Sequence, residues 1–182
     1  MTLTIYGDFN CPFSALASAR ADALMAGGDH QIEWRAVQHD MTIPAAGEPL
    51  DSETGTVLVE EIAAILKLNG HDLRLHLAVP PVRSNTALAS AALAAAGDDA
   101  NRLRRRLFAA VWVEGRNVGD PVELRRLDTK SRDDAIARRW QDEYDALPRP
   151  MTPILVLPDG YVSRGLGVLA RLADLATAEA TS

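Results

Sequence analysis

The single cysteine of this 182-residue chain, Cys11, is the side chain best suited to chemistry. It stands in the segment GDFNCPFS, between an apolar strand expected over residues 3–6 and an alanine-rich helix that follows. A thiol at a helix N-terminus faces unpaired backbone N–H groups and the positive end of the helix dipole. Both favour the thiolate, which is the reactive form, so the sequence predicts a lowered pKa for Cys11.

Ser14 occupies the position where a second cysteine would complete a Cys-x-x-Cys motif. With one cysteine the chain cannot close an internal disulfide, so Cys11 can form only mixed disulfides, which a second thiol such as glutathione must release. The Ser14 hydroxyl could donate a hydrogen bond to the Cys11 thiolate from one helical turn on, or Ser14 could be only a small helix residue. Cys11 and Ser14 are therefore the candidate catalytic residues.

Charge and hydropathy limit the kinds of partner. A net charge of −6 and a pI of 5.2 argue against general binding to nucleic acid or to an anionic membrane. No apolar run is long enough to span a bilayer, and no basic leader precedes the first strand, so we expect a cytoplasmic protein. The one basic cluster, Arg-Leu-Arg-Arg-Arg at 102–106, is expected to be a solvated helix face.

The histidines do not form a recognisable metal motif. They stand at His30, His39, His71 and His76, without the spacing of zinc ligands, so no metal site is expected. His39 begins a long loop that should border the active site. It could act as a base or bind substrate there, but a solvated loop histidine is the simpler expectation.

The order of the expected elements indicates an α/β protein. Strands are expected over residues 3–6, 31–37, 154–157 and 161–163. Helices are expected over residues 12–25, 57–68, 85–96, 100–113, 120–127, 131–144 (capped by Ser131) and 166–178. The first two strands should be parallel, because a helix joins them, and the last two should form a hairpin. A loop over 38–55 is long enough to be functional or mobile.

Three segments, in this order, give the chain a family resemblance. They are DFNCPFS after the first strand, MTP at 151–153 before the strand at 154–157, and a helical segment containing SNT at 84–86 and EGRNVGD at 114–120. The chain resembles the DsbA superfamily, and within it the FrnE-like branch and its relatives, the 2-hydroxychromene-2-carboxylate isomerases and kappa-class glutathione transferases. The resemblance implies a thioredoxin-like fold with a helical insertion between its βαβ and ββα halves. The implied domains are a thioredoxin-like domain over 1–40 and 148–182 and an insertion over 53–146.

The resemblance also implies roles for residues far from Cys11 in the sequence. A cis bond before Pro153 would let Thr152 offer its backbone N–H and C=O to an extended peptide or to glutathione. Ser163 and Arg164 would hold the γ-glutamyl end of glutathione. A trans-proline and a simple helix cap with a surface arginine are the open alternatives. The candidate substrate- or glutathione-binding residues are Pro12, Phe13, Thr152, Pro153, Ser163 and Arg164.

The motif is mixed in the terms of that family. Its oxidoreductases carry cysteine where this chain has Ser14, and its isomerases and kappa transferases carry serine where this chain has Cys11. We expect a DsbA-family thiol–disulfide oxidoreductase with no tightly bound cofactor and with glutathione as candidate co-substrate. The alternatives are a glutathione-dependent isomerase or transferase acting on a small aromatic substrate, and a non-catalytic binding or chaperone-like module. The expected partner is a small thiol or disulfide, not nucleic acid or a membrane, and pairing with a second copy of the chain is left open.

Overall fold

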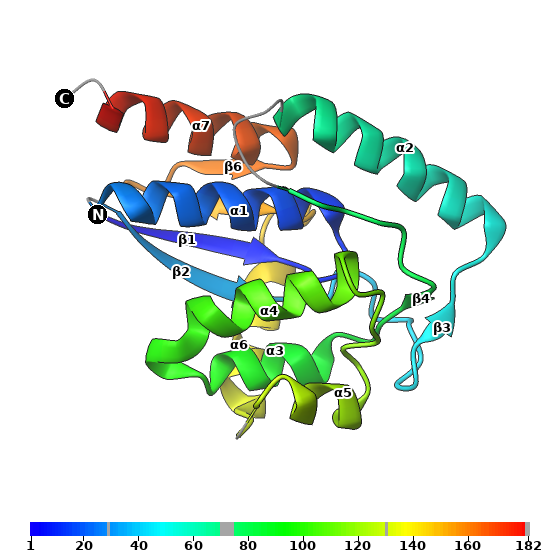
Figure 1. Ribbon diagram of the computed structural model, residues 1–182. Helices are drawn as coiled ribbons and strands as arrows, with labels where there is room; N and C mark the ends of the chain where they lie inside the picture. Colours follow the sequence, from blue (N-terminus) through cyan, green and yellow to red (C-terminus); the bar gives the residue numbers. More distant parts are fainter. Residues whose placement is uncertain (29, 70–74, 130, 181–182) are drawn as a thin grey trace.

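A four-stranded sheet with the order β2-β1-β5-β6 organises the chain (Figure 1). The computed structural model describes residues 1–28, 30–69, 75–129 and 131–180. The strands are β1 Thr2–Gly7, β2 Gln31–Ala36, β3 Glu48–Pro49, β4 Val82–Arg83, β5 Ile154–Val156 and β6 Val162–Arg164. The α-helices are α1 Pro12–Gly27, α2 Ser52–Asn69, α3 Ala87–Ala94, α4 Ala100–Trp112, α5 Pro121–Arg126, α6 Asp134–Asp145 and α7 Leu166–Ala180.

The strand directions confirm the predicted α/β architecture. Strand β1 is parallel to β2 and antiparallel to β5, and β6 pairs with β5 in a hairpin. Strands β3 and β4 form a separate two-stranded sheet, which the sequence did not predict. The sheet is thus built from the two ends of the sequence, with α2 to α6 between them. The predicted domain boundaries within this arrangement stay a prediction.

Two predicted helix starts were wrong because acidic side chains cap the helices. The loop before α2 ends earlier than expected: Asp51 accepts hydrogen bonds from the backbone N–H and the hydroxyl of Thr54, so α2 begins at Ser52 instead of at residue 57. The cap of α6 is Asp133, whose carboxylate accepts from the backbone N–H of Ile136, and not Ser131.

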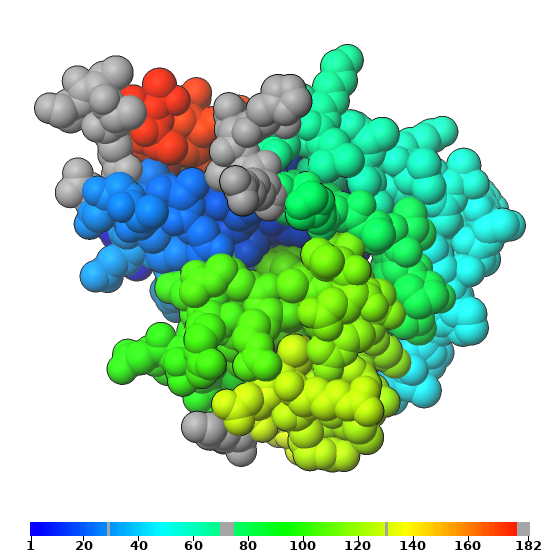
Figure 2. Space-filling view, viewed as in Figure 1, coloured from blue at the N-terminus to red at the C-terminus, as the bar shows by residue number. Residues whose placement is uncertain are grey.

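The two faces of the sheet are covered by different helices. Leu3, Ile5 and Leu155 face a core that includes α1 and α7, two helices that pack against each other. Tyr6 and Ile154 face the opposite side, where a second core contains side chains of α6. This alternation follows from the period of two in a strand. Figure 2 shows α1 at the surface between α7 and α4.

The expectation of a solvated basic face at 102–106 was wrong for its central residue. The Arg104 side chain is fully buried where α4 packs on α1. Its guanidinium donates to the Ser18 carbonyl at 2.9 Å and to the Asp22 carboxylate at 2.5 Å, and it lies 5.2 Å from the centre of the Trp34 ring. Position 104 lies on the same helix face as the buried Leu107, and so its side chain is buried too. Protein groups therefore replace water as the hydrogen-bond partners of the guanidinium.

Across the described residues, none of the helices combines the length and the apolarity that a membrane crossing requires.

Candidate active site

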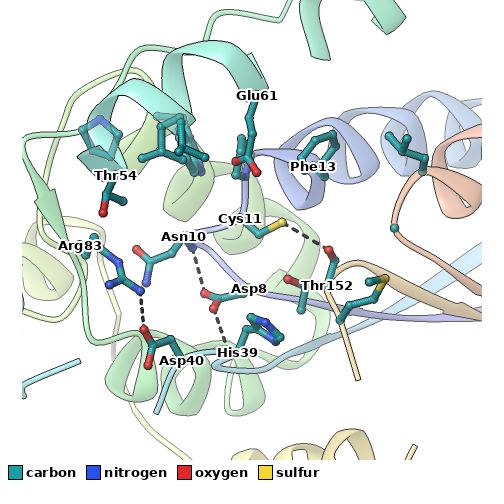
Figure 3. Close-up of a pocket in the computed structure, with 18 of the residues that line it drawn as sticks. Asp8, Asn10, Cys11, Phe13, His39, Asp40, Thr54, Glu61, Arg83 and Thr152 are labelled. Carbon is teal, nitrogen blue, oxygen red and sulfur yellow. Dashed lines mark hydrogen bonds and ion pairs between the residues drawn. The ribbon is translucent and has the colours of Figure 1, made fainter. Parts of the chain in front are cut away.

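A cavity of about 840 Å³ lies where β1 and β2 end, and Cys11 is on its wall (Figure 3). Its apolar lining residues include Pro12, Phe13, Ile43, Val57, Leu58 and Leu166. Its polar lining residues include Asp8, Asn10, His39, Asp40, Glu61 and Arg83. Glu61 comes from α2 on one wall, and His39 and Asp40 lie on the opposite wall. The cavity therefore joins a thiol to a mainly apolar chamber with charged groups at defined places.

Cys11 lies at the start of α1, as predicted, with Pro12 in the first helical position. The thiol is partly buried, and Sγ donates a hydrogen bond of 3.5 Å to the backbone carbonyl of Thr152. The peptide bond between Thr152 and Pro153 is cis, as the resemblance implies. The thiol and the loop before β5 thus meet at the cavity, although 141 positions separate the two residues.

The pKa of Cys11 is raised, so the predicted direction was wrong. Burial of the thiol is the main cause, and the carboxylate of Asp8 adds to the rise. Interactions with Thr152 and Ser14 lower the pKa by less than burial raises it. The sequence motif shows the helix N-terminus but not the chain segments that cover the sulfur. Burial by these segments decides the direction of the pKa shift. The resting residue is a neutral thiol that serves as a hydrogen-bond donor.

We expect the rate of Cys11 alkylation by iodoacetamide to rise with pH around a midpoint above the value of about 8.5 for free cysteine. Burial disfavours the thiolate, so the reactive form accumulates only at higher pH. Free cysteine, measured in the same buffers, is the control. A midpoint at or below that of free cysteine would show that the helix N-terminus outweighs burial.

Ser14 lies one turn along α1 from Cys11 and does not line the cavity. Its side chain is fully buried, and within the described part of the chain its Oγ has no conventional hydrogen-bond partner. It nevertheless acts on Cys11, because its hydroxyl and its backbone N–H both lower the pKa of the thiol. Any role of Ser14 in catalysis would therefore pass through the Cys11 sulfur, and that role stays a prediction.

Four of the other candidate residues line the cavity: Pro12, Phe13, Thr152 and Arg164. The guanidinium of Arg164 also donates to the Pro148 carbonyl at 3.1 Å.

Two candidates do not reach the cavity lining. Pro153 is buried behind Thr152, and Ser163 is buried beside a separate hollow that Asp159 and Tyr161 line. The proposed glutathione contacts of all these residues stay predictions. Of the histidines, His71 lies outside the described residues.

Asp8 is the main site residue that the sequence analysis missed. Its buried carboxylate accepts hydrogen bonds from the backbone N–H groups of Asn10 and His39, both at 2.9 Å, and from the Thr86 hydroxyl at 3.4 Å. Burial raises its pKa. One carboxylate thus fixes the turn that carries Cys11 and the loop that follows β2. An acid directly after a buried strand was the available signal.

A second missed group lies at the far end of the cavity from α1. Arg83 pairs with Asp40 at 2.5 Å and with Glu48 at 2.8 Å, which ties β4 to the loop after β2 and to β3. Hydrogen bonds from Thr42 and Arg83 lower the pKa of Asp40 to about 2. Glu48 and Asp40 are 35 and 43 positions from Arg83 in the sequence, so no local pattern joins them.

The comparison with known families agrees with this geometry. Residues 2–135 match the model of the DSBA-like thioredoxin domain. The chain belongs to this family. No curated protein matches the sequence of this DsbA-like protein at a significant level.

Solved structures resemble the DsbA-like chain over its whole length. A 2-hydroxychromene-2-carboxylate isomerase is 20% identical with a TM-score of 0.64, and the match covers 100% of this chain and 95% of the isomerase. A probable DsbA oxidoreductase from Streptomyces coelicolor is 16% identical with a TM-score of 0.69, over 100% and 91% of the two chains. The cytosolic disulfide reductase DsbM from Pseudomonas aeruginosa, solved with GSH, is 18% identical with a TM-score of 0.64, over 100% and 98%. These likenesses show the fold.

Proposed function

We propose that this DsbA-like protein is a glutathione-linked thiol–disulfide oxidoreductase that works with one cysteine. The observation that carries the proposal is the position of Cys11 Sγ, on the wall of the cavity and 3.5 Å from the Thr152 carbonyl. A backbone carbonyl at that place offers an edge along which a peptide-like ligand such as glutathione can pair. The DsbM structure solved with GSH supports the choice of co-substrate by analogy of fold.

The reaction needs two exchanges at the same sulfur. The Cys11 thiolate attacks the glutathione sulfur of a mixed disulfide between glutathione and a small thiol. A bond forms between Cys11 Sγ and glutathione, and the small thiol leaves as a thiolate. A second glutathione thiolate then attacks the glutathione sulfur held on Cys11, which releases the Cys11 thiolate and glutathione disulfide. Because Ser14 replaces a second cysteine, the resolving thiol must come from solution.

Mass spectrometry tests the intermediate directly. After incubation with glutathione disulfide, the intact protein should gain the mass of one glutathione at Cys11, and excess glutathione should remove it. The adduct should be absent from the Cys11→Ser variant. A protein that forms no adduct when folded, but forms one when unfolded in urea, would contradict the proposal.

Replacing Ser14 with cysteine is expected to create an internal disulfide with Cys11. The two positions are one helical turn apart, and the Ser14 hydroxyl already interacts with the Cys11 sulfur. After treatment with diamide, a thiol assay in urea should detect no free thiol in the variant. The intact mass of the variant should show no diamide adduct. Two remaining free thiols would show that the side chains at 11 and 14 do not face each other.

A second candidate function, a glutathione-dependent isomerase acting on a small aromatic compound, is favoured by two observations. The cavity of about 840 Å³ has room for an apolar molecule beside glutathione. The raised pKa of Cys11 leaves an S–H group that could donate a hydrogen bond to the glutathione sulfur without forming a bond to it. In that case serine at position 11 should retain part of the activity.

A further inference from the structure

His39 is an exposed loop residue, as the sequence predicted, but it is held in place from two sides. Its backbone N–H donates to Asp8 Oδ2 at 2.9 Å, and its ring nitrogen Nδ1 lies 2.7 Å from the hydroxyl oxygen of Tyr144. The two rings meet edge to face at 80°, with centroids 6.4 Å apart. Asp8 and Tyr144 are both almost fully buried, so the fixed core of the protein sets the position of this ring.

The contact with Tyr144 indicates which ring nitrogen of His39 carries a proton. Burial raises the pKa of Tyr144, so its hydroxyl stays protonated and can donate. Among the described residues Nδ1 is the only hydrogen-bond partner of this buried hydroxyl, so donation to Nδ1 is the arrangement that gives its proton an acceptor. In that arrangement the ring proton is on Nε2. Nε2 contacts no other polar group in the described part of the chain, and the exposed His39 side chain lines the cavity. The site thus presents an N–H donor to a bound molecule.

Asp8 links the segments that carry Cys11 and His39. Asp8 binds the backbone on both sides, through Asn10 next to Cys11 and through His39 itself. Both side chains line the same cavity, and in Figure 3 Cys11 and His39 lie on opposite sides of Asp8. A substrate in contact with the Cys11 sulfur would therefore have the His39 ring on the wall beside it.

We propose that His39 is a catalytic residue of the exchange described above, and that its Nε2–H donates a hydrogen bond to the sulfur that leaves when Cys11 attacks a disulfide. The inference rests on the proposed function. When the new bond forms to Cys11 Sγ, the broken bond leaves its electron pair, and so a negative charge, on the departing sulfur. A fixed donor stabilises that charge without transferring a proton, and solvent protonates the free thiolate later. Tyr144 and Asp8 are positioning residues.

The dependence of the rate on the leaving thiol tests this role. A thiolate leaves faster when its thiol has a lower pKa, so a donor matters most for a basic alkyl thiolate. Two substrates serve: the mixed disulfides of glutathione with 2-mercaptoethanol and with 2-nitro-5-thiobenzoate. His39→Ala should slow single-turnover exchange about 100-fold on the first and about 3-fold or less on the second. His39→Gln, which keeps an N–H donor at about the same reach, should recover most of the lost rate on the first substrate.

Two further variants complete the experiment. Tyr144→Phe should lower the rate selectively on the alkyl substrate, because the ring and its proton are no longer fixed. His76→Ala should match the wild type on both, since His76 is exposed and lies outside the cavity lining. An equal loss on both substrates in His39→Ala, with unchanged thermal unfolding, would overturn the inference and leave the proposed function standing. No exchange by the wild type on either substrate would overturn the proposed function as well.

Discussion

The Cys11→Ser variant is expected to lose disulfide exchange to below about 10⁻³ of the wild-type rate, the scale on which nucleophile removal acts. Exchange needs a bond to sulfur at this position, and a serine hydroxyl neither forms it nor ionises at neutral pH. The fold should be unaffected, because Cys11 is the N-terminal cap residue of α1 without a side-chain capping bond, and serine is favoured at such positions.

Single-turnover exchange with the nitrothiobenzoate disulfide of glutathione measures this loss, and thermal unfolding checks the fold. Cys11→Ala is the matched control. An oxidoreductase loses activity equally in both variants, whereas an isomerase that uses a hydrogen bond from position 11 should keep part of its activity with serine and lose it with alanine. Exchange near the wild-type rate in Cys11→Ser would exclude Cys11 as the nucleophile.

The Arg104→Ala variant is expected to lower the free energy of unfolding by about 3–5 kcal/mol. The truncation leaves the Ser18 carbonyl without its buried donor, removes one partner of Asp22 and opens a cavity beside the Trp34 ring. Arg105→Ala is the matched control, because Arg105 follows in the same helix and pairs with the same Asp22 at 3.1 Å but is about half exposed. Its loss should be within about 1 kcal/mol.

Urea denaturation of the two variants gives the comparison. A loss in Arg104→Ala as small as that in Arg105→Ala would mean that water replaces the buried guanidinium at little cost. Arg104→Met should recover part of the stability, since an apolar side chain of similar length fills the space without leaving a buried charge.

The fold could be predicted from the sequence because its signals are local. Leu3 and Ile5 alternate with polar neighbours, a helix-length segment joins two strands, and Pro12 and Gly28 stand at the two ends of that helix. The site could be predicted in part, because Cys11 and Thr152 lie in short motifs directly next to strands.

The rest depends on contacts between distant segments. The buried role of Arg104 depends on α1, the ion pairs of Arg83 on the loop after β2, and the orientation of His39 on Tyr144, 105 positions away. None of these neighbours is visible in a local pattern. The same reason explains the wrong direction for the pKa of Cys11: the helix N-terminus is a local feature, and the burial that outweighs it comes from residues far along the chain.

The pairing of Cys11 with Thr152 also has a consequence for how the protein is made. A ribosome produces the thiol early and its partner carbonyl 141 residues later, so a growing chain carries the cysteine without the β5-β6 half of the sheet. During that interval the sulfur should ionise as an ordinary thiol, with a pKa near 8.5. Completion of the sheet then buries the sulfur and raises its pKa. The rate at which iodoacetamide modifies Cys11 in nascent chains of increasing length would therefore report the length at which the sheet forms.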